Sequence, residues 1–228
     1  IVAPWSNYPY FTYRLSFIMP SIIRRLDHIR DIAHTTHETF STDRGTYTGI
    51  TDNGYQHGAG KMVYNNGNQY KGRWNIDKRH GRGRMDYANG DTYSGFWKNN
   101  KYHGVGTVKY ADGDMYTGHW KNGLRHGSGT LLSSNGDKYQ GDWIDDEVTD
   151  YGKCTYHNGD IYQGNYNGTF QHGLGKMIYA NGDIYYGYWS QDQRHGTGCM
   201  KYSNELIYNG QWRKDTPAKV AIIQRHTI

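Results

Sequence analysis

The sequence predicts an all-β protein: an elongated, single-layer antiparallel β-meander of hairpins, with a short amphipathic helix near its N-terminus. One observation behind this prediction is a pattern that recurs every 23 residues without insertion, and a second is its alternation of apolar and polar positions. A third is the Asn-Gly or Asp-Gly pair that closes most units, a sequence typical of tight hairpin turns. A fixed period of this length indicates a repeat array, in which each unit contacts only its neighbours. At a strand spacing of about 4.8 Å, the hairpins would span about 70 Å.

The first half of each unit reads Tyr-x-Gly-x-Trp. Because side chains alternate along a strand, Tyr, Gly and Trp share one face. Gly leaves that face bare, so a neighbouring aromatic ring is expected to lie over it. The Trp position holds Thr51 in repeat one and Tyr166 in repeat six. Repeats one to seven begin at Tyr47, Tyr70, Tyr93, Tyr116, Tyr139, Tyr162 and Tyr185, and a partial eighth begins at Tyr208.

The second half of each unit alternates as well and predicts a second half-buried strand. Gly precedes each of its apolar residues by two positions, and an aromatic residue follows most of them by two. Turn pairs then close six of the units, from Asn66-Gly67 in repeat one to Asn181-Gly182 in repeat six, so each unit is expected to form one hairpin. The apolar residues are Met62, Met85, Val108, Leu131, Cys154, Met177 and Met200.

The residues before the array change their pattern twice. Residues 1–19 are rich in aromatic residues and predict an extended arm that packs on another surface. Residues 20–38 predict an amphipathic helix with Ser21 as its N-cap, and residues 39–46 a linker. The favoured interpretation of the helix is a cap over the open edge of repeat one, because an open sheet edge invites pairing with other chains. Docking to a partner protein and binding to a membrane surface are the alternatives.

The array extends over residues 47–212, and residues 213–228 predict a basic tail with four basic residues and one acidic residue. Repeat seven carries Glu205-Leu206 in place of Gly-Asp, which suits the start of a terminal cap. The apolar run at residues 220–223 is expected either to add an edge strand or to bind another chain.

The residue pattern resembles the MORN (membrane occupation and recognition nexus) repeat, which combines Tyr-x-Gly-x-Trp, His-Gly-x-Gly, an aromatic residue and Gly-Asp. The resemblance covers residues 47–212. MORN arrays occur in ciliary radial-spoke proteins, cytoskeletal scaffolds of protists and junctophilins. The resemblance therefore implies a non-catalytic scaffold that binds other proteins within a eukaryotic assembly, with a cilium, its axoneme or the cytoskeleton as the leading location. MORN arrays also occur in a lysine methyltransferase and in plant phosphoinositide kinases, so a membrane-tethering or phosphoinositide-binding module and the regulatory region of a larger enzyme are alternatives.

Composition and charge exclude some functions. A mean hydropathy of −0.96 is very polar for a folded protein, so the aromatic residues must supply the buried area. The sequence holds no apolar run long enough for a transmembrane helix. The array carries 17 basic and 16 acidic residues, so it is a poor polyanion binder and nucleic acid is not an expected partner. Cys154 and Cys199 fall on opposite faces two repeats apart, too far for a disulfide, which fits a reduced intracellular compartment.

Three groups of residues are candidate contact sites. The expected partners are other protein subunits, with weak contact to acidic membrane lipids and formation of a homodimer as further expectations. The first group is an aromatic groove, with structural and partner-binding roles: Tyr70, Trp74, Tyr93, Trp97, Tyr116, Trp120, Tyr139, Trp143, Tyr185 and Trp189. The second group is an acidic patch of repeat five, for docking a basic partner: Asp142, Asp145, Asp146, Glu147 and Asp150. The third group is a basic patch of repeat two: Lys71, Arg73, Lys78, Arg79, Arg82 and Arg84.

Repeat five also has Thr149-Asp150 where the other repeats have His-Gly. A docking function for this departure is one interpretation, and drift in a solvated loop is the other.

Two ladders of polar residues recur once per repeat. Equivalent atoms in adjacent repeats lie about 10 Å apart, whereas imidazoles that share a zinc ion lie about 2 Å from the metal. Each His is therefore expected to hydrogen-bond its own turn, and each Asp to accept hydrogen bonds from turn N–H groups. No catalytic residue, metal site or cofactor is expected. The ladders are His57, His80, His103, His126, His172 and His195, and Asp91, Asp114, Asp137, Asp160 and Asp183.

Overall fold

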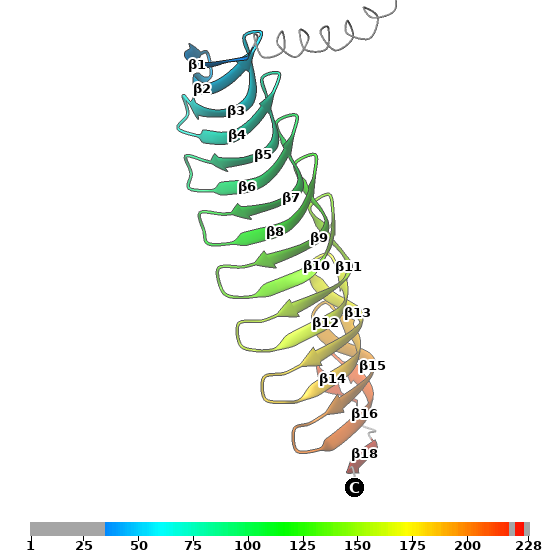
Figure 1. The fold of residues 1–228 in the computed structure, drawn as a ribbon. Coiled ribbons are helices and arrows are strands. Elements are labelled where there is room, and N and C mark those ends of the chain that lie inside the picture. The colour runs from blue at the N-terminus through cyan, green and yellow to red at the C-terminus, as the bar shows by residue number, and fades with distance from the viewer. Residues whose placement is uncertain (1–34, 219–221, 226–228) are drawn as a thin grey trace, which may run out of the picture.

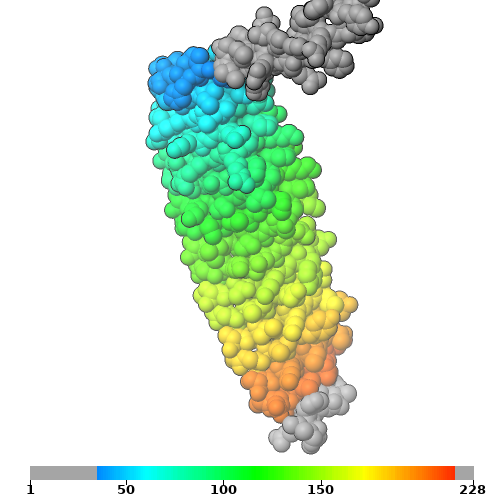
Figure 2. Space-filling view, viewed as in Figure 1, coloured from blue at the N-terminus to red at the C-terminus, as the bar shows by residue number. Residues whose placement is uncertain are grey.

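The computed structural model describes residues 35–218 and 222–225. Within these ranges the chain is a single open antiparallel sheet, and this part of the chain contains no helix. Figure 1 shows the hairpins stacked one after another along a rod. Figure 2 shows the colours following the chain in bands from one end of that rod to the other, so residues far apart in sequence lie far apart in space. The predicted elongated all-β meander is confirmed.

The strands follow one another along the rod in nearly the same order as in the sequence. They are β1 (Thr35–Thr42), β2 (Gly45–Asp52), β3 (Tyr55–Tyr64), β4 (Gln69–Asn75), β5 (Lys78–Asp86), β6 (Thr92–Lys98), β7 (Lys101–Lys109), β8 (Met115–Lys121), β9 (Leu124–Leu132), β10 (Lys138–Ile144), β11 (Glu147–Thr155), β12 (Ile161–Asn167), β13 (Phe170–Ile178), β14 (Ile184–Ser190), β15 (Gln193–Lys201), β16 (Leu206–Arg213), β17 (Thr216–Pro217) and β18 (Ile222–Arg225).

The repeats share one pairing register. Tyr70 on β4 lies opposite Met85 of its own hairpin and opposite Met62 of the preceding repeat. Gly72, two residues after Tyr70, likewise lies between Gly60 and Gly83 on the two neighbouring strands. Within the hairpin a β-bulge follows this Gly, before the Trp position, and the same bulge recurs in other repeats. Because a shift by one residue would turn the aromatic side chains to the opposite face, burial of that face specifies the register.

The core is a ladder of aromatic rings along one face of the sheet. The ring of Tyr93 lies over the paired glycines Gly95 and Gly106, where any Cβ atom would collide with it, as the sequence predicts. Its hydroxyl donates a hydrogen bond to the main-chain carbonyl of Phe96 at 2.7 Å, and burial raises the pKa of this hydroxyl well above its usual value. Trp97 stands edge-on to Tyr93 with the ring centroids 5.1 Å apart. The same edge-on contacts continue through the repeats and join them into one core.

Side chains at both edges of the sheet tie each repeat to the next. At the edge formed by the Asn-Gly turns, the Asp91 carboxylate accepts a hydrogen bond from the N–H of Ala111 in the following turn at 2.8 Å. At the other edge, the hairpin edge, Asp77 accepts one from the N–H of Gln56 in the preceding repeat at 2.8 Å. The other four residues of the Asp ladder bond the following turn as Asp91 does. The predicted bonding of these carboxylates to turn N–H groups is therefore confirmed, and the turn concerned belongs to the neighbouring repeat.

The N-terminal boundaries differ from those predicted. Most of the expected helix 20–38, and the whole of the arm 1–19, lie outside the described residues. The end of that helix and the expected linker 39–46 are instead occupied by β1 and the start of β2. The reason is that β1 is rich in β-branched Thr, which favours strands, and pairs along its whole length with β2. The ring of Phe40 on β1 packs against that of Tyr47 with the centroids 5.4 Å apart, so this strand adds one more ring to the aromatic core.

At the other end, the expectation of an edge strand in the tail 213–228 is confirmed. Strand β18 pairs antiparallel with β16, and the short β17 pairs with the same strand nearer the hairpin edge. The partial eighth repeat thereby becomes a paired strand, and its Trp212 is buried like the Trp of a full repeat.

Candidate functional site

The face of the sheet opposite the aromatic core, called the outer face, carries the side chains that alternate with the core positions. In repeat four these are Thr117 and His119 on β8 and Ser128 and Thr130 on β9. Across neighbouring strands they fall into rows along the rod, because the register places equivalent residues side by side. One of these rows, the central row, consists of exposed residues from β4 to β11: Arg73, Arg82, Phe96, Val105, His119, Ser128, Asp142 and Tyr151.

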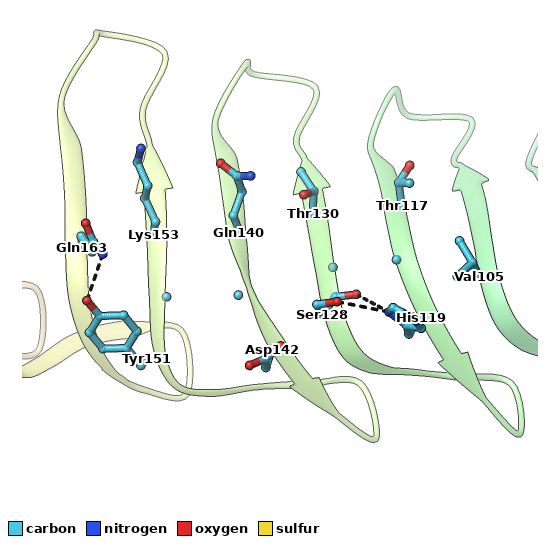
Figure 3. Close-up of a pocket in the computed structure, with 14 residues that line it drawn as sticks. Val105, Thr117, His119, Ser128, Thr130, Gln140, Asp142, Tyr151, Lys153 and Gln163 are labelled. Carbon is cyan, nitrogen blue, oxygen red and sulfur yellow. Dashed lines mark hydrogen bonds between the residues drawn. The ribbon is translucent and has the colours of Figure 1, made fainter.

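The outer face is hollowed between repeats three and six. The hollow has a volume of about 580 Å³. Glycines such as Gly118 and Gly141 line it together with side chains of the central row and of a second row beside it, formed by Thr117, Thr130, Gln140 and Lys153. Figure 3 shows Val105, His119, Ser128, Asp142 and Tyr151 along one side of it and Thr117, Thr130, Gln140 and Lys153 along the other. Two hydrogen bonds order its walls: Gln163 Nε2 donates to the Tyr151 hydroxyl at 3.0 Å, and His119 Nδ1 lies 3.2 Å from the Ser128 carbonyl. An open, polar hollow floored by main chain suits the binding of a polypeptide segment or of long polar side chains.

The aromatic residues expected to form a groove for partners are the protein's own core. Nine of the ten have at most 5% of their surface exposed, and Tyr139 is half-buried. Two effects bury them in a single sheet. Each Tyr ring lies down over glycines, and long side chains cover the Trp rings, as Arg79 covers Trp97 with its guanidinium 4.6 Å from the ring centroid. A partner that approaches the rod therefore meets the outer face and the edges.

The residues of the predicted acidic patch differ in whether they have a partner within the chain. Asp146 is engaged within the chain, because its carboxylate accepts hydrogen bonds from the main-chain N–H and the side-chain Nε of Arg125 at 2.9 and 3.0 Å. Asp145 lies 3.5 Å from His126 Nδ1. The other three residues are exposed and take part in no ion pair within the described chain, and of these only Asp142 belongs to the central row. They are Asp142, Glu147 and Asp150.

The predicted basic patch is divided as well. Lys78 begins β5 at the hairpin edge, and Arg79 is committed to the core side, where it covers Trp97 and donates to Asn100. The other four stand exposed on the outer face: Lys71, Arg73, Arg82 and Arg84. Arg84 Nη2 lies 2.6 Å from Asp86 Oδ1, whereas Lys71, Arg73 and Arg82 take part in no ion pair within the described chain.

Sequence reasoning missed one member of this cationic surface. Lys61 of repeat one lies directly opposite Lys71, which lies opposite Arg84 on its other side. Like charges in directly opposed positions destabilise a sheet. The alternation along β3 already places Lys61 on the outer face, so extending the patch into the neighbouring repeat could have found it.

The His ladder does not bond as expected. The Nδ1 atoms of His57, His80, His103 and His126 are buried and make no hydrogen bond. The N–H groups at the hairpin edge are bonded instead by side chains of the next repeat, as Asn100 bonds Arg79. Among the residues that the structure describes, no group of His, Cys, Asp and Glu is placed to hold a metal ion.

A scan of protein-family models decides the family. The MORN repeat model matches seven consecutive segments, at residues 47–69, 70–92, 93–115, 116–138, 139–161, 162–184 and 185–206. The chain belongs to the MORN-repeat family. A comparison with curated proteins finds no match. No helix in the described part of this MORN protein is both long and apolar enough to cross a membrane.

Several solved structures are similar to the MORN array at low identity. One is the TCP domain of SAS-4 (dCPAP) of Drosophila melanogaster in complex with a proline-rich motif of Ana2 (dSTIL), with 15% identity, 92% of this chain and 99% of that chain covered, and a TM-score of 0.46. Another is the TCP10c domain of Drosophila melanogaster Sas-4, with 14% identity, coverages of 78% and 100%, and a TM-score of 0.43. The TCP10 domain of Danio rerio CPAP with a STIL peptide has 10% identity, coverages of 83% and 99%, and a TM-score of 0.28. Scores this low do not indicate a shared function.

Departures from the MORN pattern concentrate where repeat five meets repeat six. Tyr139 Oη, Trp143 Nε1 and Tyr166 Oη are all buried without a hydrogen-bond partner, whereas the equivalent atoms elsewhere bond main-chain carbonyls. The pairing of β11 with β12 stops at Tyr151 opposite Asn165, although the equivalent pairings elsewhere continue to the Trp position. The junction between repeats five and six is therefore held by fewer bonds than the others, and it lies beside the hollow and the acidic residues.

Proposed function

We propose that this MORN protein is a non-catalytic scaffold that binds other proteins through its outer face. The observation that carries the proposal is that the outer face changes its chemistry from repeat to repeat while the backbone register stays constant. It is cationic at Arg73 and Arg82, apolar at Phe96 and Val105, and acidic at Asp142.

A rigid sheet that presents a different surface at each step can hold several partners at defined spacings. Because all strands belong to one sheet with a continuous aromatic core, a load on one repeat is transmitted to the next through paired main chain. The family resemblance favours a eukaryotic assembly, with cilium and cytoskeleton as the first places to look, and this location is part of the proposal.

The test is affinity purification of the tagged full chain from its source cells, followed by mass spectrometry. A variant that removes three side chains lining the hollow, with His119, Asp142 and Tyr151 replaced by Ala, is compared with the parent chain. A matched control replaces Lys98 and Lys121, which are exposed at the hairpin edge, by Ala. The proposal expects stoichiometric partner subunits with the parent chain and the control, and their loss with the outer-face variant. Equal recovery from all three chains would refute a role of the outer face.

A second candidate function, membrane association, is favoured by the cationic residues Lys61, Lys71 and Arg73. All three are exposed and have no acidic partner in the described chain, and Lys61 lies directly opposite Lys71. Sedimentation with vesicles that contain an acidic lipid is the test. Binding that falls with salt and with replacement of these residues by Gln would support it, whereas binding unaffected by either would exclude it.

A further inference from the structure

The array has a positively charged region, in repeats two to four, and a negatively charged region, in repeat five. Repeats two to four carry 12 basic and 6 acidic residues, giving +6, and repeat five carries one basic and six acidic residues, giving −5. Within the described chain, the close contacts between basic and acidic side chains that join these two regions lie where repeat four meets repeat five. They are the ion pair Arg125–Asp146 and the contacts His126–Asp145 and His157–Asp137. The cations of repeat two lie three repeats from repeat five, about 30 Å away, which exceeds the Debye length of about 10 Å at moderate salt. The stiff rod cannot bring its own two charged regions together.

A second copy of the chain can bring them together. We infer that two copies associate antiparallel through their outer faces, related by a two-fold axis that runs along the strands between β7 and β8. Under this operation β5 of one copy faces β10 of the other, and β4 faces β11. Each contact then occurs twice, because a two-fold interface is self-complementary.

In this arrangement the central rows of the two copies face each other, and their charged and apolar residues match. Arg82 faces Asp142 of the second copy, and Arg73 faces the exposed ring of Tyr151, a cation–π pair. Neither Arg82 nor Asp142 has a partner of opposite charge within the described chain. Near the axis, Phe96 and Val105 have 40% and 50% of their surfaces exposed and face uncharged positions of repeat four. Charge is therefore matched at the ends of the row, and apolar surface is covered in the middle.

The shape of the face supports the same pairing. The hollow is lined by Asp142, Gln140 and Tyr151, and it lies where the long side chains of Arg73 and Arg82 of the second copy would arrive. The contact spans four repeats, about 40 Å, and about 13 Å across two rows, so it covers about 1,000 Å² in total. That area is at the low end for specific complexes, and a weak dimer is expected.

Two unfavourable contacts accompany this pairing. Lys71 faces Lys153 of the second copy, and the lysines of the hairpin edge, among them Lys98 and Lys121, lie on the same side of both copies. The hairpin-edge lysines are at the rim, where water and salt screen repulsion, whereas Lys71 and Lys153 meet in the second row of the contact and weaken it. Lys153→Glu is therefore expected to tighten the dimer.

The experiment is sedimentation equilibrium of the purified full chain at about 0.1 M and about 1 M salt, where the Debye lengths are about 10 and 3 Å. The parent chain is expected to form a dimer at the lower salt and to dissociate at the higher. Arg82→Glu and Asp142→Arg should each raise the dissociation constant at least about tenfold, because each places two pairs of like charges in the interface. Lys201→Glu makes the same kind of charge change outside the contact and should leave association unchanged.

A mixture of the two single variants decides the orientation. In an antiparallel heterodimer, Glu at one site meets Arg at the other in both contacts, so the mixture should recover the parent affinity although neither variant self-associates. The chain that carries both substitutions should recover it too. A monomeric parent at about 0.1 M salt, or a mixture without heterodimer, would overturn the inference while leaving the capture of other proteins untouched. If the monomer binds acidic vesicles and loses that binding on Arg82→Glu, the cations serve a membrane surface instead.

Discussion

Repeat four and repeat five share the Tyr-x-Gly-x-Trp motif but differ in the bonds that it makes. In repeat four, Tyr116 donates its hydroxyl hydrogen to the His119 carbonyl at 3.1 Å, and Trp120 Nε1 donates to a glycine carbonyl at 3.1 Å. In repeat five, the equivalent Tyr139 Oη and Trp143 Nε1 are buried with no partner. The same motif therefore places the same rings without ensuring their hydrogen bonds.

One turn of repeat six, next to repeat five, also differs from its counterparts. Hairpin-edge turns elsewhere have two residues with positive φ, such as Gln191 and Asp192, and the Asp side chain reaches back to the previous repeat. In repeat six the pair is Gly168-Thr169, and only Gly168 has positive φ. Thr169 makes neither bond to Val148, whereas Asp77 and Asp192 each bond the equivalent residue of the preceding repeat through both the side chain and the main-chain N–H. Because an array is stabilised by its interfaces between repeats, the junction of repeats five and six is expected to open first.

The largest effect is expected from glycine substitution in the two repeats. A Cβ atom at Gly118 would collide with the main chain of Gly129 and Ser128 as well as with a Tyr hydroxyl, whereas at Gly141 it would meet only the ring of Tyr139. Gly118→Ala should therefore cost about 3 kcal/mol and Gly141→Ala about 1 kcal/mol, because a half-buried ring yields more readily than paired strands. Urea unfolding followed by Trp fluorescence measures both. Equal losses would show that the two sites are packed alike.

A smaller difference is expected when the Tyr hydroxyls are removed. Tyr116→Phe should cost about 1 kcal/mol, since its hydrogen bond is lost in a buried site. Tyr139→Phe should cost nothing or stabilise slightly, because it removes a buried hydroxyl that has no partner. The same unfolding measurement serves, and a loss on Tyr139→Phe as large as that on Tyr116→Phe would contradict the comparison.

The missing link can be restored. Thr169→Asp introduces the acceptor found at other hairpin-edge turns and should gain up to about 1 kcal/mol by bonding the N–H of Val148. Hydrogen exchange of β11 and β12 is the direct readout, and protection there should rise. Asp192→Ala, which deletes the bond of 2.7 Å to Gln171, is the matched control and should lower protection one repeat further on. Unchanged exchange in the Asp variant would mean that the turn is not the cause.

The smallest effect concerns acid. The main-chain N–H of His157 lowers the pKa of the Asp137 carboxyl from its ordinary value of 3.8. A carboxyl whose pKa is lower in the folded state stabilises the fold above its ordinary pKa, and this contribution disappears as pH falls through the folded-state value. Unfolding followed between pH 6 and pH 2 should show stability falling below about pH 4, and less steeply for Asp137→Asn. Identical profiles would show that the carboxylate does not link these repeats.

Some features of the fold were predictable from the sequence and others were not. Tyr93 over Gly95 and the Asn-Gly turns were predictable because their causes are local: strand alternation, the missing Cβ of glycine and the φ angles of a turn. The strand at residues 35–42 was not predicted, because it depends on the free edge of β2. Nor was the way in which the Trp rings are covered, since it depends on side chains such as Arg79 of β5, which lies over Trp97 of the neighbouring strand.

The amino-acid sequence alone determined the repeat, its hairpin, its register and the residues of its core, because each of these follows from periods of two and 23 residues. Only the tertiary structure decided which charges remain free on the outer face. Arg79 and Arg82 are three residues apart in one basic run, yet Arg79 covers a core ring and Arg82 is exposed on the other face. Their odd spacing puts the two side chains on opposite faces of the strand, and the pairing of Arg79 with Trp74 of β4 decides which of them lies on the core side.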